Sequence, residues 1–424
     1  MLVRILVIGI NYAPERTSVG PFTTGLCEHL VAQGHQVTVV TAFPYYPEWR
    51  VWDGYRGSLY RREILNGVTV HRVAHYVPHK ASRVLERLAY DFTFTIAAFV
   101  AALFTPKCDV IYCSCPPPTV GLAAYVLGKI KGVPYVMKLT DLASDAALAT
   151  GILKEGLAIR MALALEGFLY RKARTVVCLC QGFIEKLTAR GVPAEKFRLI
   201  PDWGDTERIR PVESDGTFRG ANGFGAGQFL ILHSGNMGKK QNLINVVNAA
   251  EYSQGEIDLV WVLVGEGEDL PALKRAAEDR APNMSLLPLQ PAEGMPQMYA
   301  AADVLLLNQI AAMEDAVIPC KLLTYMAAGR PIVAAVNENS EAARVIRRAQ
   351  CGVIVPAEDP ETLSTAMLAL QKDPELRRVL GANARLYAEM HFTKASVLEA
   401  YDKFFLTVLC TTGLSLAVEE VPET

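Results

Sequence analysis

The sequence predicts an α/β protein made of two tandem Rossmann-like, doubly wound domains with a cleft between them. Three observations lead to this fold class. Short apolar runs of strand length alternate with segments of helical periodicity in both halves of the chain. Between the halves lies a glycine-rich stretch, SDGTFRGANGFGAG, after which the alternation starts again. The chain has 424 residues, which is too long for one ordinary domain and suits two.

The first half opens with a strand–helix–strand unit. Ile5–Ile8 is a continuous apolar run, as expected of a parallel strand that is covered on both faces. Phe22–Gln33 has the apolar spacing of a helix, and Val37–Val40 is the next strand. The other strands expected in this half are Val68–Val73, Val110–Cys113, Tyr135–Leu139 and Val176–Leu179. We expect this half to form a first domain over residues 1–205.

The second half repeats the pattern after a linker, which we expect over residues 206–227. Its strands are expected at Phe229–Leu232, Leu259–Val264, Val304–Leu307, Ile332–Ala335 and Val353–Val355. Its helices are expected at Asn242–Tyr252, Leu270–Arg280 and Lys321–Ala328. We expect the second domain to cover residues 228–390. Residues 391–424 then supply a helix that crosses back to the first domain, near Lys394–Leu409, and a tail.

The composition excludes several classes of protein. With 51% hydrophobic and 20% charged residues, the chain is neither disordered nor collagen-like. Its nine cysteines are scattered and form neither a disulfide framework nor the paired C-x2-C pattern of a zinc site. No apolar stretch reaches the ~18 residues needed to span a bilayer, and the first residues lack the features of a signal peptide. We therefore expect a cytoplasmic protein without a metal centre.

The charges are unevenly distributed along the chain. Residues 1–205 hold 23 Lys and Arg against 16 Asp and Glu, whereas the remainder holds 19 against 28. A basic half suits an anionic partner such as a lipid surface or a diphosphate. Chance variation in surface charge is the alternative. We expect no nucleic-acid partner.

The stretch His233–Lys240, HSGNMGKK, follows an expected strand and precedes a helix. Gly235 and Asn236 offer backbone amides there, and Lys239 and Lys240 add two adjacent positive charges. A diphosphate needs amides that point inward and cations that offset its charge. Adjacent lysines on a loop are otherwise simply solvated, so both interpretations stay open.

The segment Pro319–Lys321 opens a helix that ends near Gly329. A cation at a helix N-terminus opposes the helix dipole. Lys321 is therefore better explained if an anion is bound between the lysine and the helix, although a solvated lysine that tolerates a small penalty is the alternative. The turn VLVGEGEDL, at Val262–Leu270, is a weaker candidate for anion binding, because it lacks the third glycine of a dinucleotide-binding motif.

In the first half, Asp141 follows the expected strand Tyr135–Leu139. A carboxylate at the carboxyl end of a parallel strand is placed to orient an acceptor hydroxyl or to take its proton. A helix N-cap is the competing interpretation.

The helix expected over Leu85–Phe104 is apolar on nearly every side toward its end. Lys80, Arg83 and Arg87 fall on one helical face at its start. A basic patch beside an apolar helix suits a membrane interface or an acceptor attached to one. A buried core helix explains the apolar part equally well.

Six segments of the chain carry a family resemblance when taken in order. They are NYAPERTSVGPFTTGLCEHLVAQGHQVTVVT (Asn11–Thr41), IPDWGD (Ile200–Asp205), HSGNMGKKQ (His233–Gln241), VLVGEGEDLPALK (Val262–Lys274), YAAADVLLL (Tyr299–Leu307) and IPCKLLTYMAAGRPIVA (Ile318–Ala334). Together they resemble glycosyltransferase family 4, and within it the bacterial exopolysaccharide branch that includes the colanic-acid-type transferases. The resemblance covers most of the chain.

The resemblance implies a GT-B fold and a retaining transfer of a sugar from a nucleotide-diphosphate sugar. The C-terminal domain would hold the donor, and the N-terminal domain would hold a saccharide acceptor, which we expect to be lipid-linked. It implies no cofactor and no obligatory metal. The expected location is the cytoplasm, with peripheral contact to the inner face of the cell membrane.

The resemblance also assigns roles to single residues. Those expected to carry the reaction are Asp141, Lys239 and Lys321. Those expected to hold the donor are Gly20, Gly235, Asn236, Lys240, Leu287, Cys320 and Thr324. Family members commonly have two glutamates in the last of the six segments and just before it, and this chain has Ala316 and Thr324 in their places. Glu314 or Asp315 is the expected substitute for the first glutamate, which lies beside the donor sugar.

Two other functions remain open at this point. One is a nucleotide-sugar epimerase of the same fold, and the other is a non-catalytic protein that binds nucleotide sugars. A transferase releases the nucleotide diphosphate only when an acceptor is present, which separates the three. A dinucleotide-dependent oxidoreductase is disfavoured because no G-x-G-x-x-G follows an expected strand.

Overall fold

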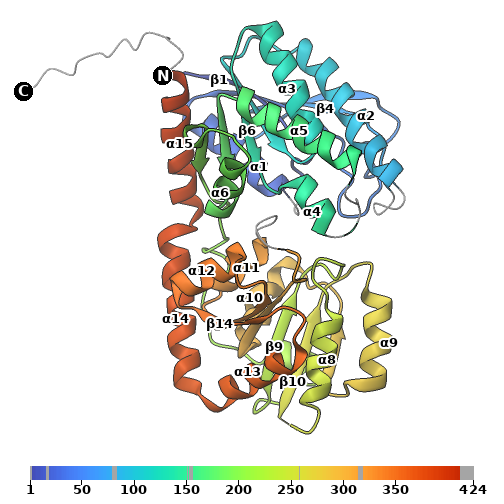
Figure 1. The fold of residues 1–424 in the computed structure, drawn as a ribbon, viewed down its shortest axis with the longest axis vertical. Helices are drawn as coiled ribbons and strands as arrows, with labels where there is room; N and C mark the ends of the chain where they lie inside the picture. Colours follow the sequence, from blue (N-terminus) through green and yellow to red (C-terminus); the bar gives the residue numbers. More distant parts are fainter. Residues whose placement is uncertain are drawn as a thin grey trace, which may run out of the picture.

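The computed structural model describes residues 2–15, 19–78, 84–149, 151, 156–256, 258–313 and 319–410. The chain forms two α/β lobes, one above the other in Figure 1, which confirms the predicted fold class. Each lobe is built around one sheet, with helices on both faces of it. In the order of the chain, the first lobe is the N-terminal domain and the second is the C-terminal domain.

The N-terminal sheet has eight strands in the order β3-β4-β2-β1-β5-β6-β7-β8. All neighbouring strands are parallel except β3, which is antiparallel to β4. The strands are β1 (Arg4–Ile8), β2 (Gln36–Ala42), β3 (Tyr60–Leu65), β4 (Val68–Val73), β5 (Val110–Cys115), β6 (Tyr135–Leu139), β7 (Thr175–Cys178) and β8 (Phe197–Leu199). The central strands β1 and β5 are almost wholly buried, as their continuous apolar runs predict.

Helices cover the N-terminal sheet on both faces. One face packs against α1 (Gly20–Ala32) and α15 (Lys394–Cys410). The other face packs against α2 (Val84–Leu103), α3 (Pro118–Lys131), α5 (Leu157–Lys172) and α6 (Gln181–Ala189). The short elements α4 (Ala143–Ala149) and η1 (Ala194–Lys196) complete the domain.

The C-terminal sheet has six parallel strands in the order β11-β10-β9-β12-β13-β14. The strands are β9 (Phe229–Ser234), β10 (Leu259–Val264), β11 (Met284–Leu287), β12 (Val304–Asn308), β13 (Ile332–Val336) and β14 (Gly352–Pro356). On one face lie α8 (Ile244–Tyr252), α9 (Leu270–Arg280) and α13 (Pro360–Lys372). On the other lie α10 (Met295–Ala301), preceded by η2 (Ala292–Gly294), and α11 (Cys320–Ala327), α12 (Glu341–Ala349) and α14 (Pro374–His391).

The chain crosses between the domains twice, and the two crossings touch. The backbone N–H of Gly204, on the first crossing, donates to the carbonyl oxygen of Phe392, on the second, over 2.8 Å. Beyond Phe392, α15 lies on the N-terminal domain, where the hydroxyls of Tyr401 and Tyr112 are 3.1 Å apart. Figure 1 shows α14 and α15 running one after the other along the same side of both lobes.

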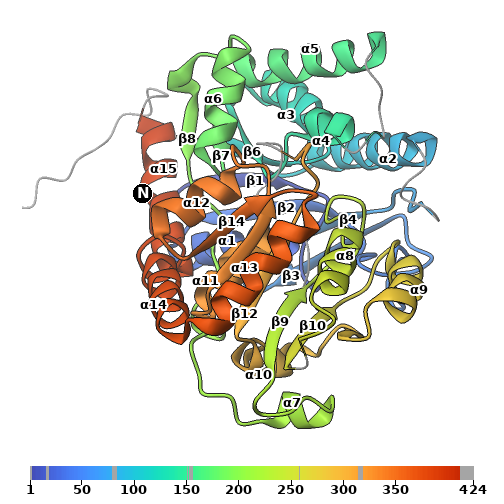
Figure 2. The ribbon, with the colours of Figure 1, turned by 60° about the horizontal axis from the view of Figure 1, so that its bottom comes forward.

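The segment expected as a linker, 206–227, is packed on the C-terminal domain. It contains the short helix α7 (Thr217–Ala221), whose Phe218 is buried in the core of that domain. The Arg219 guanidinium donates to the carbonyl of Ala301 and to the Asp303 carboxylate. Figure 2 places α7 at the end of the C-terminal domain remote from the N-terminal domain.

Across the residues that the structure covers, none of the helices combines the length and the apolar character that a bilayer crossing requires.

Candidate active site between the domains

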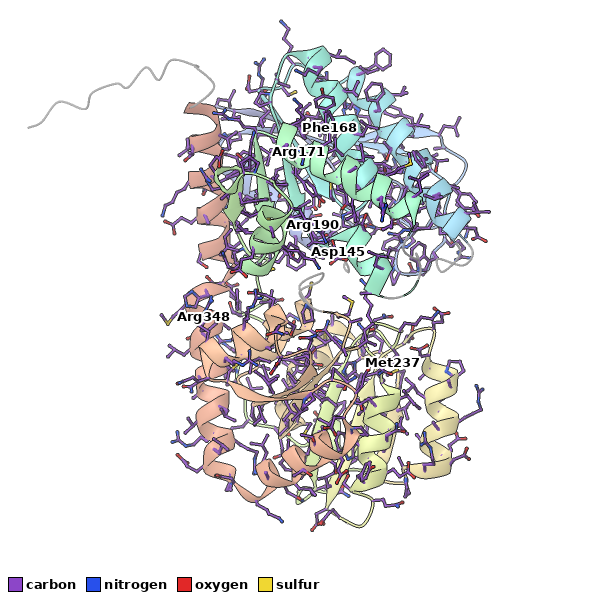
Figure 3. All side chains as sticks on the ribbon, viewed as in Figure 1. Asp145, Phe168, Arg171, Arg190, Met237 and Arg348 are labelled. Carbon is purple, nitrogen blue, oxygen red and sulfur yellow. The ribbon has the colours of Figure 1, made fainter. Side chains whose placement is uncertain are left out.

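The carboxyl ends of the strands of both sheets point toward the space between the domains, where ligands bind in doubly wound folds. Side chains meet across this space. Lys240 Nζ of the C-terminal domain lies 3.8 Å from Asp141 Oδ2 of the N-terminal domain. Arg344 and Glu185 form a second cross-domain pair at 3.2 Å. In Figure 3, Asp145 and Met237 mark the two edges that face each other.

Two glycine loops lie against one another in the C-terminal domain. The loop after β9 donates from Gly235 N to Val264 O over 2.9 Å, and from Met237 N to Glu266 O over 2.8 Å. A Cβ atom on Gly265 would stand 1.9 Å from the carbonyl oxygen of Gly235, and one on Gly267 would stand 2.2 Å from that of Met237. This close backbone contact therefore requires both glycines of the GEGE sequence after β10.

Gly265→Ala should destabilise the C-terminal domain, because the new methyl group has no space without separating the two loops. We expect a loss of about 1–3 kcal/mol in the free energy of unfolding, measured by urea denaturation. Gly255→Ala is the matched control, since no atom lies within 4 Å of a Cβ at that position. Equal urea midpoints for the two variants would contradict the packing argument.

Buried polar side chains hold the loop after β9 in place. Asn308 donates to the carbonyl oxygens of Gln241 and Asn242 over 2.6 and 3.1 Å, and it accepts from Asn245 over 3.0 Å. The Tyr325 hydroxyl on α11 accepts from Ser234 N over 2.9 Å. The loop is thus tied to β12 and to α11, which gives it the rigidity that anion binding requires.

Lys321 extends from the first turn of α11 toward this loop. A Cβ on Gly235 would lie 3.2 Å from Lys321 Nζ, so the ammonium group rests against the glycine backbone. Lys321 Nζ lies 3.1 Å from His233 Nε2. The His233 Nδ1 lies 3.1 Å from the carbonyl oxygen of Leu306. Because a carbonyl only accepts, Nδ1 carries the hydrogen, and Nε2 accepts from the lysine.

Burial acts on both members of this pair. His233 is completely buried, and its pKa lies well below the ordinary value because of this desolvation and the adjacent Lys321. The imidazole is therefore neutral and serves as a fixed acceptor. Desolvation also lowers the pKa of Lys321 to about 7, with a small opposing effect of Cys320. An anion bound beside Lys321 would favour its charged form.

Asp141 faces these groups from the N-terminal domain. Desolvation raises its pKa to about 6, with opposing contributions from Lys240 and Arg87. Arg87 lies in the first turn of α2, where its guanidinium stacks over the ring of Tyr90 at 4.9 Å. It is thus close enough to the cleft to act on Asp141. The helix-cap interpretation does not fit Asp141, because α4 begins at Ala143 and the residue before it is Leu142. The contact of Asp141 with Lys240 is that of a cleft residue.

The other predicted donor residues differ in how they lie relative to Lys321, His233 and Asp141. Lys239 is exposed and lies near Asp269, where it opposes the rise that desolvation and Glu268 cause in the pKa of that carboxyl group. Lys240 instead reaches across the cleft. Asn236 is exposed, and its side chain donates to Gln241 over 3.4 Å.

Four further predicted residues occupy the borders of the cleft. Gly20 begins α1, and Leu287 ends β11, where its carbonyl accepts from Gly265 N over 3.0 Å. Thr324 is half-buried on α11, one turn after Lys321. Cys320 is exposed to the cleft, although desolvation and the nearby Asp202 raise the pKa of its thiol to about 12 and keep it protonated.

Four predicted residues lie outside the described residues, namely Glu314, Asp315, Lys80 and Arg83. Within the ranges that are described, no group of three or more His, Cys, Asp and Glu side chains is arranged to hold a metal ion.

Two functional candidates escaped the sequence analysis. One is His233, which was treated only as the start of a glycine loop. The other is the buried ion pair of Lys138 and Asp202, whose charged atoms are 2.5 Å apart. Although burial alone lowers the pKa of Lys138, Asp202 more than offsets this and raises it. A histidine at the end of an apolar strand was the available signal for the first; the second had none, because its partners are 64 residues apart.

A cavity of ≈ 420 Å³ lies behind this centre, at the crossing between the domains. Its walls come from both domains and include Asp202, Cys320, Glu341, Arg348 and Phe392. The cavity adjoins the first turn of α11 but is separate from the Lys321–His233 pair, which is not part of its lining.

Comparison with known families accounts for nearly the whole chain. Residues 17–203 match the model described as a glycosyl transferase 4-like domain, and residues 215–387 match the model described as glycosyl transferases group 1. The chain is 32% identical over 406 residues to WcaI of Escherichia coli K12, a protein named for glycosyl transfer in colanic acid biosynthesis. This match covers 94% of the chain and 98% of WcaI.

Solved structures of low sequence identity share the fold. Sucrose-phosphate synthase from Thermosynechococcus elongatus superposes with a TM-score of 0.75 at 16% identity, covering 96% of this chain and all of the other. HepE from Anabaena, in complex with UDP-glucose, superposes with a TM-score of 0.69 at 17% identity over 96% of this chain and all of HepE. Neither the epimerase nor the binding-protein alternative is favoured by these matches. The chain belongs to glycosyltransferase family 4 of the GT-B fold, and it is a glycosyltransferase.

Proposed function

We propose that the protein transfers a sugar from a nucleotide-diphosphate sugar to a hydroxyl of a lipid-linked saccharide, with retention of anomeric configuration, in the biosynthesis of an exopolysaccharide or another cell-surface glycan. The likeness to WcaI supports the pathway class. The nucleotide sugar bound in HepE supports the donor class.

The observation that carries the proposal is the Lys321–His233 pair against Gly235. A diphosphate leaving group needs positive charge that is already in position when the sugar–oxygen bond breaks. Here a desolvated lysine is oriented by a neutral, buried imidazole and rests against the backbone of Gly235. The N–H of Gly235 is itself bonded to Val264, so the lysine, and not this predicted amide, is the group free to contact the diphosphate. Lys240 supplies a second cation on the same loop.

The reaction follows from the two sides of the cleft. The bond between the anomeric carbon and the phosphate oxygen breaks, and its electron pair stays with the nucleotide diphosphate, next to Lys321 and Lys240. The acceptor oxygen forms the new bond on the same face, and its proton passes to the departing phosphate. Asp141 accepts a hydrogen bond from the acceptor hydroxyl and so positions it. The diphosphate displaces Asp141 from Lys240.

A metal ion is not required in this scheme, because the lysines take its electrostatic role. We expect the same rate in excess EDTA as in Mg²⁺.

The test is a release assay with UDP-, GDP- and dTDP-sugars, first ranked by the thermal stabilisation that each gives. Saccharide-loaded lipid extracted from the source cells serves as acceptor. We expect nucleotide diphosphate to be released, and radiolabelled sugar to reach the lipid, only when donor and acceptor are both present. NMR of the product should show the anomeric configuration of the donor. Conversion of the donor without any acceptor would refute the proposal in favour of an epimerase.

A further inference from the structure

Helix α2 has two apolar faces, and the protein covers only one of them. Tyr90, Phe94, Ala98 and Ala102 recur at every fourth position and are buried in the N-terminal core. The opposite face carries six large apolar side chains, each at least 45% exposed, namely Leu85, Leu88, Phe92, Ile96, Val100 and Phe104 at its end. We call these six residues the outer stripe.

The outer stripe follows the full length of the helix. Its spacing of three and four residues keeps it on one face, and twenty residues of helix extend for about 30 Å. Single exposed apolar residues need no explanation, but a contiguous stripe of six does. Folding does not account for it, because the inner face alone fills the core.

Neighbouring helices extend the apolar surface and add charge. Helix α3 lies between α2 and α5, and the three lie side by side on one flank of the N-terminal domain in both views (Figures 1 and 2). Helix α3 exposes Ile130, and α5 exposes Leu157 and Met161. On the three helices the exposed charged side chains are all positive, namely Lys129, Arg160, Arg171 and Lys172, whereas Glu86 and Asp91 of α2 are half-buried.

We propose that this flank docks onto the surface of a membrane that contains anionic lipids, with the outer stripe inserted among the acyl chains and the cations against the headgroups. The charge pattern favours this occupant. Apolar side chains alone would fit any partner, but exposed charges of a single sign beside them are complementary to an anionic lipid surface. Such charges would repel a second copy of the same flank.

The inference rests on the proposed function, because it assigns a location to a lipid-linked acceptor. The N-termini of α2, α3 and α5 lie at the cleft, as they follow the carboxyl ends of the strands. The outer stripe therefore begins at the cleft, where Arg87 acts on Asp141, and runs away from it. A lipid anchored beside this flank would present its saccharide near Asp141.

The test is flotation of the full chain with vesicles in a density gradient. One set of vesicles is phosphatidylcholine alone, and the other contains one quarter phosphatidylglycerol. The variant carries Ile96→Asp and Val100→Asp on the outer stripe. The matched control carries Leu386→Asp and Met390→Asp, which are exposed apolar residues on α14 of the other domain, at 57% and 62% exposure.

We expect the wild type and the control to float with the anionic vesicles and the stripe variant to lose at least tenfold in bound fraction. Binding should weaken in high salt and with phosphatidylcholine alone. Unchanged flotation of the stripe variant, or no flotation of the wild type, would overturn the inference. So would a wild-type dimer in sedimentation equilibrium that the stripe variant converts to a monomer.

Thermal stabilisation by nucleotide sugars is measured on the same samples. Equal stabilisation of the three proteins shows that the variants are folded and that the donor site is intact. A chain that floats but binds no nucleotide sugar would leave the membrane surface standing and remove the proposed function. A chain that binds donor but does not float would do the reverse.

Discussion

Replacing Lys321 by alanine should lower kcat by roughly 10²–10³-fold, the effect of removing one preorganised group that faces developing charge in a transition state. Lys321 is held against Gly235 by its hydrogen bond to His233, so it needs no reorganisation when charge moves onto the diphosphate. Steady-state kinetics with the donor selected by the release assay measures this loss.

The fold should survive this substitution. The lowered pKa of Lys321 shows that the site disfavours its charge when no anion is bound, so the alanine variant should melt at the wild-type temperature or above it. Lys274→Ala, an exposed lysine on α9, is the matched control and should keep the wild-type rate. A Lys321→Ala enzyme within threefold of the wild type would remove this residue from the mechanism.

There is a physical reason why some strands could be predicted from the sequence and others could not. Continuous apolar runs are unambiguous, and Leu259–Val264 and Tyr135–Leu139 were predicted with the bounds that the structure gives to β10 and β6. The strand β3, YRREIL, was not predicted, because it lies at the sheet edge, where none of its residues is buried, and its two arginines and glutamate interrupt any apolar run. The strand β8 has only three residues and no periodicity.

For the candidate site, too, features that are local in sequence could be predicted and contacts between distant residues could not. Loop motifs that are local in sequence, such as the glycines after β9 and the lysine that opens α11, could be located. Their partners could not, since Lys321 and His233 are 88 residues apart. Which of two adjacent lysines crosses the cleft was also undecidable from sequence, because it depends on how Ile310 N holds the carbonyl of Lys240, over 3.1 Å.

The second large effect expected is a dependence of kcat/KM on pH, because Lys321 must be protonated to bind the diphosphate. In the free enzyme the pKa of Lys321 is about 7, and only the cationic form binds the diphosphate well. As pH rises through this pKa the cation is lost, so kcat/KM should fall about tenfold per unit and ~10²-fold by pH 9. On the acid side the pKa of Asp141 is about 6. Its carboxylate is lost as pH falls through that value, so kcat/KM should also fall on the acid side, and its pH profile should be bell-shaped.

Calorimetry of donor binding tests the protonation of Lys321, which causes the fall of kcat/KM above pH 7, without the transfer step. At pH 8 free Lys321 is mostly neutral, and the bound diphosphate raises its pKa, so donor binding should take up close to one proton. At pH 6 the lysine already carries its proton, so its contribution to the uptake should vanish. The uptake that remains at pH 6 belongs to Asp141, whose pKa of about 6 rises when the diphosphate displaces it from Lys240. The diphosphate of a nucleotide sugar has no proton of its own that titrates in this range. Titrations in buffers of different ionisation enthalpy measure the number directly, and Lys321→Ala should abolish the uptake at pH 8. Uptake that persists in this variant would mean that another group, and not Lys321, titrates against the bound diphosphate.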